Sequence, residues 1–329
     1  SSLAAQREMA APIGTVAITG GTHGNEANGV ELARHFLRNI DSVQRPSFRT
    51  TVTITNPAAV NANTRYIDED LNRCFLKSDL ADESRQTLEA RRAREVNQIL
   101  GPKGSDGCAV DLIIDLHNTT AATGVALLMA PGDALCHAIA ARLQEVDSSV
   151  RIANWTKGAA DYPLLPSIAP HGMTFEVGPA PWGCLEPASY AQSLRLVHAA
   201  LDYVHSHNLA LKAGGPWREI SVPVFCSAGK PVDYPRHADG TLAAMIHPSL
   251  QGHDFTPLKM GDPIFQTHGL ETIRFGEMSD GSASHAAVAA LCGEVYPFFI
   301  NEAAYYEKGV AFALATQEQR MVKLAGSTI

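Results

Sequence analysis

The chain has 329 residues, a hydrophobic content of 45% and a formal net charge of −8, which is typical of a globular protein with a sizeable core. A nucleic-acid-binding protein would carry a basic stripe, and the mixed charges of this sequence contain none. The sequence contains no uninterrupted run of about 18 apolar residues, so it predicts no membrane-spanning helix. The charged beginning of the sequence does not match a signal peptide.

Strand-like and helix-like segments alternate through the first two thirds of the sequence. Short apolar runs predict strands at residues 15–18, 50–55, 110–116, 124–130 and 172–178. Longer amphipathic patterns predict helices at residues 29–40, 82–100, 134–146 and 186–207. This alternation indicates an α/β domain with a largely parallel or mixed sheet.

The pattern changes after the last of these helices. Residues 208–217 gather two glycines and a proline, which predicts a linker. The apolar runs that follow are short and broken by turn residues, as in a small β-rich domain. We therefore expect two domains, residues 1–213 and residues 214–329.

The six cysteines are spread along the chain without a C-x-x-C pair. This spacing favours reduced thiols and a cytoplasmic location over a disulfide framework. It also argues against a structural zinc site built from cysteines. The residues are Cys74, Cys108, Cys136, Cys184, Cys226 and Cys292.

The segment ITGGTHGNEANG, residues 18–29, joins the first expected strand to the first expected helix. A Gly-rich turn at this place often binds phosphate. This one, however, lacks both the G-x-G-x-x-G spacing and the Gly-Lys-Ser/Thr ending of nucleotide-binding loops. It offers instead His23 and Glu26, which are three residues apart and able to converge on one metal ion. The sequence of this turn therefore favours a metal-binding site over a nucleotide-binding loop.

A third metal ligand is expected at the end of another strand. His117 follows the apolar run VDLIIDL, and open α/β sheets place their sites at the carboxyl ends of strands. Two histidines and one glutamate are a known ligand set of catalytic zinc. Asp115, on the same side of the strand, is a candidate acceptor for an imidazole nitrogen. The alternative is a loop histidine at His23 and a core histidine at His117, without a metal.

Two further stretches carry charges that a metal site could use. TRYIDEDLNRCF, residues 64–75, is either a solvated loop or a binding site in which Arg65 and Arg73 meet an anion. Glu176 interrupts an apolar strand. Because an unpaired buried carboxylate is costly, Glu176 is either a general base with a raised pKa or an edge-strand residue that faces solvent.

Together these residues resemble the aspartoacylase and aminoacylase-3 group of zinc amidohydrolases, which are related to the zinc carboxypeptidases. The resemblance implies a zinc carboxypeptidase-like mixed sheet flanked by helices, with a smaller β-rich C-terminal domain that caps the active-site entrance. The matching segments follow one another in order over nearly the whole chain: GGTHGNE (20–26), ITNPAAV (54–60), TRYIDEDLNR (64–73), DLHNTT (115–120), FEVGP (175–179), VDYPR (232–236), HPSLQ (247–251) and NEAAYYEKGVAF (301–312).

The resemblance also implies roles for single residues. His23, Glu26 and His117 match the ligands of one Zn²⁺ per chain. Glu176 matches the general base and acid, and Arg65 matches the arginine that polarises the scissile carbonyl. The implied reaction is hydrolysis of an N-acyl amino acid by a metal-activated water molecule, with a free amino acid and a carboxylate as products.

Four residues match substrate-binding positions of the group. Asn72 and Arg73 match the pair that binds the α-carboxylate, and Tyr305 matches a tyrosine that reaches over the substrate from the second domain. Tyr162 is retained, but Pro166 stands where aspartoacylases carry an arginine for the side chain of N-acetyl-aspartate. Losing such a contact would cost roughly 2–5 kcal/mol for an acidic side chain. We therefore expect N-acetyl amino acids with neutral or aromatic side chains as substrates.

Several alternatives stay open at this point. Lys157 or Arg151 could replace the missing charge, which would keep N-acetyl-aspartate as a substrate. A succinyl-amino-acid hydrolase or a carboxypeptidase would share the zinc ligands, and a catalytically silent binding protein could share the fold. We expect a small-molecule partner, neither nucleic acid nor membrane insertion, and a homo-oligomer, as is usual in this group.

Overall fold

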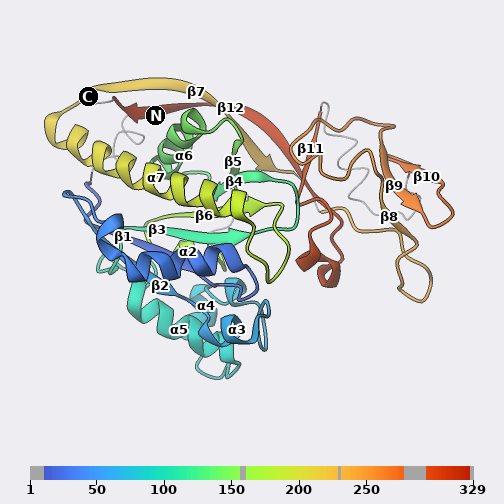
Figure 1. Ribbon diagram of the computed structural model, residues 1–329, viewed down its shortest axis with the longest axis horizontal. Coiled ribbons are helices and arrows are strands. Elements are labelled where there is room, and N and C mark those ends of the chain that lie inside the picture. Colours follow the sequence, from blue (N-terminus) through green and yellow to red (C-terminus); the bar gives the residue numbers. More distant parts are fainter. Residues whose placement is uncertain (1–10, 156–160, 229–230, 278–293, 327–329) are drawn as a thin grey trace.

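The computed structural model describes residues 11–155, 161–228, 231–277 and 294–326. A nine-stranded sheet with the order β11-β12-β7-β5-β4-β6-β3-β1-β2 runs through the molecule (Figure 1). Strands β1, β2, β3 and β6 run parallel, whereas β4 runs antiparallel to β6, so the prediction of a mixed sheet is confirmed. The strands are β1 (Thr15–Gly20), β2 (Arg49–Ile54), β3 (Leu112–Asn118), β4 (Gly124–Met129), β5 (Val150–Asn154), β6 (His171–Gly178), β7 (Trp217–Ser227), β11 (Tyr296–Phe298) and β12 (Ala313–Ala325).

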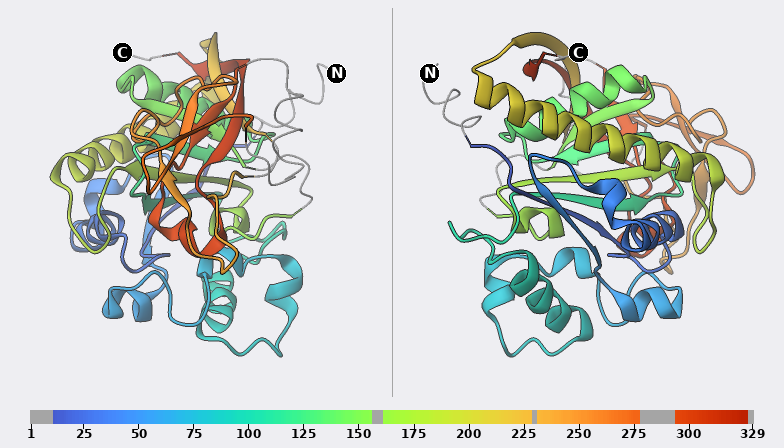
Figure 2. Two further views of the ribbon diagram at one scale, coloured as in Figure 1. Left: turned by 90° about the vertical axis from the view of Figure 1, so that its right-hand side faces the viewer. Right: turned by 60° about the vertical axis from the view of Figure 1, so that its left-hand side comes forward.

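One face of the sheet is covered by helices α2 (Ala27–Arg38), α6 (Ala134–Val146) and α7 (Pro187–Ala213). In Figure 2, α7 lies lengthwise across the strands with α2 beside it. Alternate strand residues point toward these helices, as the two-residue period of a strand requires. Val16 and Ile18 of β1, for example, share one buried core with Phe36 of α2.

The opposite face is covered at one end by α5 (Leu88–Leu100), η2 (Leu71–Arg73) and η3 (Leu165–Ile168), which pack on Ala17 of β1 and Ile113 of β3. Helix α5 begins later than residue 82, because Thr87 caps it by accepting a hydrogen bond from the Ala90 N–H at 3.2 Å. The sequence patterns predicted neither β5 nor the short helices, among them η1 (Ile40–Val43), α3 (Pro57–Ala62) and α4 (Lys77–Ala81).

The prediction of a linker at residues 208–217 is wrong for its first half. Residues 208–213 continue α7, because LALKA is composed of residues that favour helix. Helix α7 ends only where Gly214 adopts a left-handed conformation with φ 77°. Within the described residues, no helix is both long enough and apolar enough to cross a membrane.

The chain between β7 and β12 forms a smaller β-rich part, at the right of Figure 1. Strands β8 (Ala244–Ile246), β9 (Pro263–Thr267) and β10 (Thr272–Arg274) form an antiparallel sheet beside their own core. Strands β7 and β12 flank this stretch of sequence, and they extend the nine-stranded sheet. The domain boundary between residues 213 and 214 stays a prediction. The two long strands β7 and β12 connect the two predicted domains.

Candidate active site

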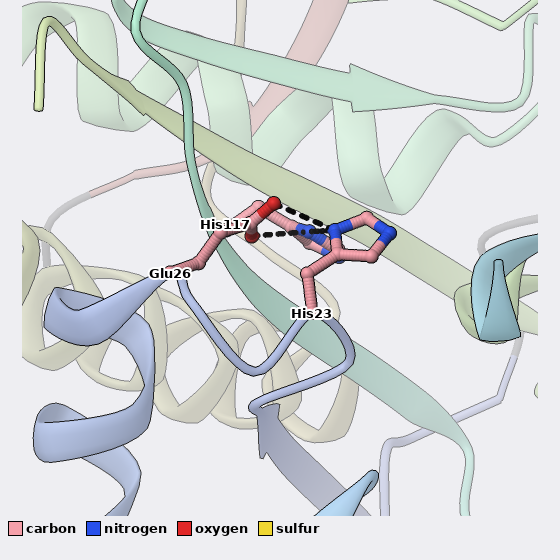
Figure 3. A group of neighbouring side chains, drawn as sticks. All are labelled: His23, Glu26 and His117. Atoms are coloured by element: carbon pink, nitrogen blue, oxygen red, sulfur yellow. Dashed lines mark hydrogen bonds and ion pairs between the residues drawn. The ribbon is translucent and has the colours of Figure 1, made fainter. Parts of the chain in front are cut away.

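His23, Glu26 and His117 form a compact buried group at the carboxyl ends of β1 and β3. His23 and Glu26 lie in the turn between β1 and α2, and His117 points toward them from β3 (Figure 3). Nδ1 of His23 is 2.6 Å from Oε1 of Glu26, and Nδ1 of His117 is 2.8 Å from Oε2. The two Nδ1 atoms are 3.1 Å apart, so three potential ligand atoms converge.

The glycines of the turn allow this convergence. Gly21 has φ 71°, a left-handed conformation that favours glycine. A Cβ atom on Gly24 would lie 2.0 Å from the carbonyl carbon of Ala59 in α3, so this position accepts no side chain. The turn can therefore pack directly against α3 while it presents His23 and Glu26 to His117.

Each imidazole directs its other nitrogen to a buried carboxylate. Nε2 of His23 is 2.9 Å from Oδ1 of Asp70, and Nε2 of His117 is 2.7 Å from Oδ2 of Asp115. The hydroxyl of Thr19 donates to Asp115 Oδ1 at 2.6 Å. Carboxylates in this position fix the tautomer and orientation of metal-binding imidazoles. Asp115 lies where the sequence suggested such an acceptor, whereas sequence reasoning missed Asp70.

The charges of the group fit a divalent cation. When each Nε2 donates its proton to a carboxylate, the Nδ1 lone pairs of His23 and His117 face each other and Glu26. Burial favours neutral Glu26, but the two imidazoles outweigh it and hold its pKa well below the usual value. Burial also opposes the charged form of His117, but Asp115 and Glu26 outweigh it and raise the pKa of this imidazole, so without a metal a proton takes the place of the cation on its Nδ1. Two imidazoles and a carboxylate are ligands that suit zinc.

Glu176 lies beside this group. It is the register partner of His117 in the adjacent parallel strand, so both side chains point to the same side of the sheet. Because β6 lies between β3 and β4, the alternative of an edge-strand residue is wrong. Burial raises the pKa of Glu176 to about 8, which allows proton exchange near neutral pH.

Arg65 connects the group to Asp70. Its Nη1 is 3.3 Å from Oε1 of Glu26, and its Nη2 is 3.3 Å from Oδ2 of Asp70. Arg65 is mostly buried and lines the cavity described next. A fixed guanidinium in this place could donate hydrogen bonds to an oxygen that gains negative charge.

A cavity of about 470 Å³ opens over the face of the sheet that is opposite to helices α2, α6 and α7. One side of the cavity, called the polar side, is lined by residues from the turn after β1, from β6 and from neighbouring segments. These residues are His23, Arg65, Asn72, Arg73, Glu176, Tyr305 and Lys308. The residues named here the apolar side come from β4, from the end of β5 and from β11 and β12: Leu128, Trp155, Phe298, Phe299 and Ala313. Glu26 and His117 lie just outside this lining.

The predicted substrate-binding residues all line this cavity. Oδ1 of Asn72 accepts the Leu165 N–H at 2.8 Å, and Nη1 of Arg73 donates to the carbonyl of Asn72 at 2.7 Å. The Tyr162 ring packs against Trp155, with 5.1 Å between the ring centres. Tyr305 reaches the cavity from η4 (Ala303–Lys308), in the C-terminal part of the chain.

The segment with the missing arginine brings no cation to the cavity. Pro166 is buried in η3 and does not belong to the lining residues. Arg151 donates instead to the carbonyls of Ser148 and Val150, at 2.8 and 3.3 Å, and does not line the cavity either. Lys157 lies outside the described residues.

Sequence reasoning also missed Glu302, which attaches η4 to the main sheet. Its Oε2 accepts the Thr119 hydroxyl and, at 2.7 Å, the Thr120 N–H, directly after β3. Its Oε1 caps η4 by accepting the Ala304 N–H at 3.0 Å. No spacing in the sequence indicates this contact, because the groups that it joins are more than half the chain apart.

Comparison with known proteins identifies the family of the chain. Residues 12–204 match the succinylglutamate desuccinylase/aspartoacylase catalytic domain, and residues 224–317 match the barrel-sandwich hybrid domain of the same family. The crystal structure of murine aminoacylase 3 is similar, with a TM-score of 0.85 and 37% identity, and the match covers 96% of this chain and 99% of that one.

Two mouse proteins are similar in sequence to the same degree. The N-acyl-aromatic-L-amino acid amidohydrolase (carboxylate-forming) of Mus musculus is 40% identical over 95% of this chain and 92% of its own length. The aspartoacylase of the same organism is 40% identical over 97% of both chains. The chain therefore belongs to the succinylglutamate desuccinylase/aspartoacylase family.

Proposed function

We propose that the protein is a zinc-dependent amidohydrolase that releases free amino acids from N-acyl, in the first place N-acetyl, amino acids. The observation that carries the proposal is the buried group of His23, Glu26 and His117, with Glu176 and Arg65 close by. Zinc is proposed because two imidazoles and one carboxylate, each imidazole oriented by a further carboxylate, suit its coordination chemistry.

The chain's own residues would move the proton and stabilise the charge. When bound, the ion supplies Lewis-acid activation of water and of the acyl carbonyl. Glu176 takes a proton from the attacking water and delivers it to the leaving nitrogen, a role that its raised pKa supports. Arg65 donates its N–H groups to the carbonyl oxygen as negative charge develops there. The products are a free amino acid and a carboxylate, such as acetate.

Other residues that line the cavity would hold the substrate. Asn72 and Arg73 are proposed to bind the α-carboxylate, because an arginine fork and an amide N–H group complement its two oxygens. Tyr305 is proposed to close over the substrate from the C-terminal part, and Tyr162 to form one wall. The cavity volume of about 470 Å³ suits a small acylated amino acid.

The lining of the cavity supports a neutral or aromatic side chain on the substrate. Rings and aliphatic groups form the apolar side, and the cations among the described lining residues, Arg65, Arg73 and Lys308, all belong to the polar side. The names of the two mouse relatives do not decide the question, since both are 40% identical. For that reason N-acetyl-aspartate stays the second candidate substrate.

The test is amine release from N-acetyl-tyrosine and N-acetyl-aspartate, each with and without a zinc chelator. We expect the tyrosine compound to be hydrolysed faster and the chelator to abolish the activity, with recovery after zinc is added. Faster hydrolysis of N-acetyl-aspartate would reverse the side-chain preference and leave the metal mechanism intact. Activity that persists in the metal-free protein would contradict the mechanism, and release from neither compound would contradict the substrate class.

Two further expectations remain predictions from the sequence. The first is a homo-oligomer, which sedimentation would test. The second is a cytoplasmic location, suggested by the spacing of the cysteines. In the described residues the cysteines Cys74, Cys108, Cys136, Cys184 and Cys226 are free thiols.

A further inference from the structure

Thr174 of β6 brings a hydroxyl group to the floor of the cavity, by which we mean the sheet residues Leu128, Thr174 and Glu176 that line it. Its neighbours in the sequence, Met173 and Phe175, belong to the core under helices α2, α6 and α7. Because side chains alternate along a strand, Thr174 points to the cavity face, as Glu176 does. Two residues along a strand span about 6.6 Å, which separates this threonine from the proposed general base.

The hydroxyl of Thr174 makes no hydrogen bond within the described residues, although the side chain is only 4% exposed. Its register partner in β3 is Asp115, but that carboxylate accepts from the hydroxyls of Thr19 and Thr22 and pairs with His117. A buried hydroxyl without a partner destabilises a fold, and valine would fill the same space. Packing alone therefore gives no reason for a threonine here.

Thr174 stands where the polar and apolar sides of the cavity meet. Glu176 precedes it on the floor, and its register partner in β4 is the apolar Leu128. Leu128 pairs in turn with Ala153 of β5, so the floor continues without a polar group. Another hydroxyl of the lining, Ser227, lies at the end of β7, three strands away from β6 or about 14 Å.

We propose that the Thr174 hydroxyl forms a hydrogen bond with a hydroxyl group on the substrate side chain, so that the cavity selects a phenol over a hydrocarbon ring of the same size. This rests on the proposed function, in which Glu176 faces the scissile nitrogen and the apolar side receives the side chain. A side chain that extends from Glu176 to the apolar side crosses Thr174. A threonine hydroxyl both donates and accepts, which suits a phenolic hydroxyl.

A purely structural role for Thr174 would have a different signature. As the neighbour of Asp115 in the sheet, a threonine that merely supported this carboxylate would act on the metal group through His117. Its loss would then slow the hydrolysis of every substrate to the same degree. A threonine that binds the substrate hydroxyl affects only the substrates that carry this group.

The experiment compares the zinc-loaded wild type and Thr174→Val with N-acetyl-tyrosine and N-acetyl-phenylalanine, which differ only in the hydroxyl group. We expect the wild type to prefer the tyrosine compound, and Thr174→Val to lower the ratio of the two kcat/KM values roughly 3–10-fold. The phenylalanine compound itself should change less than about twofold, and Thr174→Ser should keep the ratio of the wild type.

Thr51→Val is the matched control. Thr51 also lies in a strand, β2, and its buried hydroxyl has no hydrogen-bond partner among the described residues, but it does not line the cavity. The ratio of the two kcat/KM values should therefore stay at that of the wild type in this variant.

Each result decides the proposal. An equal loss for both compounds in Thr174→Val would overturn it in favour of the structural role. An unchanged ratio, or a wild type without preference, would overturn it altogether. If the wild type hydrolyses neither compound, the proposed function fails. Calorimetry then decides the hydroxyl contact separately: the wild type must bind N-acetyl-tyrosine at least about threefold more tightly than N-acetyl-phenylalanine, and Thr174→Val must remove this difference, or the contact is wrong as well.

Discussion

The metal group and the apolar side of the cavity are built in different ways. Two adjacent strands and one turn present the metal group, and hydrogen-bonded carboxylates orient both of its imidazoles. The apolar side is assembled from four strands, and the C-terminal part supports it largely through contacts between rings. Phe298, for example, stacks on Phe255 with 5.4 Å between the ring centres.

The difference shows that binding a metal ion and selecting a substrate side chain place different requirements on the protein. A metal ligand has to stay within a fraction of an ångström of its position, so it benefits from a rigid strand end and from oriented hydrogen bonds. A substrate side chain needs mainly volume and apolar surface, which several combinations of residues can provide. The chemistry should therefore be sensitive to single atoms at the metal group, and the substrate preference should change more gradually on the apolar side.

The largest effect is expected for Glu176→Gln. The amide cannot accept the proton of water, so kcat should fall roughly 10²–10⁴-fold. Because Glu176 lies outside the group of three ligand residues, the zinc content should stay at that of the wild type. Elemental analysis and steady-state kinetics measure both quantities. Loss of the metal, or nearly full activity, would contradict the proposed role.

Asp115→Asn should weaken zinc binding by roughly 10–100-fold, because the carboxylate that orients His117 is replaced by an amide. Competition with a chromophoric chelator measures the affinity. Asp133→Asn provides the control, since Asp133 forms a similar pair with His171 at 2.9 Å but does not line the cavity. Equal zinc affinities for the two variants would show that Asp115 does not tune the site.

Ser227→Arg tests the selection of the substrate side chain by adding a cation at the end of β7, where Ser227 lines the cavity. We expect the ratio of kcat/KM for N-acetyl-aspartate to that for N-acetyl-tyrosine to rise on the order of tenfold, because the guanidinium can pair with the second carboxylate. Ser227→Met, which is long but uncharged, should leave the ratio low. An unchanged ratio in Ser227→Arg would place the substrate side chain elsewhere in the cavity.

The smallest effect concerns stability. Burial raises the pKa of Asp254 from 3.8 to about 6, and its Oδ2 is buried without a hydrogen-bond partner among the described residues. The folded state therefore holds this proton more tightly, so the stabilisation is complete below pH 4 and is lost as the pH rises to about 6. Asp254→Asn should raise the free energy of unfolding by about 1–3 kcal/mol at pH 7.5 and by less at pH 4.

Denaturant titrations at the two pH values measure this difference. Equal effects of Asp254→Asn at both pH values would show that the carboxyl group titrates normally in the folded protein.

The sequence by itself determined the features that depend on near neighbours in the chain. His23 and Glu26 are three residues apart in one turn, and the two-residue period of a strand places Asp115 and His117 on the same side. Alternating apolar and amphipathic segments were sufficient to predict an α/β domain with a largely parallel or mixed sheet, and the resemblance to a family favoured the mixed one. These features follow from local backbone geometry, so they can be recognised without knowledge of the fold.

Only the tertiary structure decided which distant residues complete the site. Asp70 meets His23 across 47 positions, Glu302 meets Thr120 across 182, and Lys308 meets Asp70 across 238. The apolar side likewise depends on strands that are neighbours only in the folded sheet. An apolar or charged residue in a sequence indicates burial or solvation, but its partners are set by the packing of the whole sheet, and those partners decide what the cavity accepts.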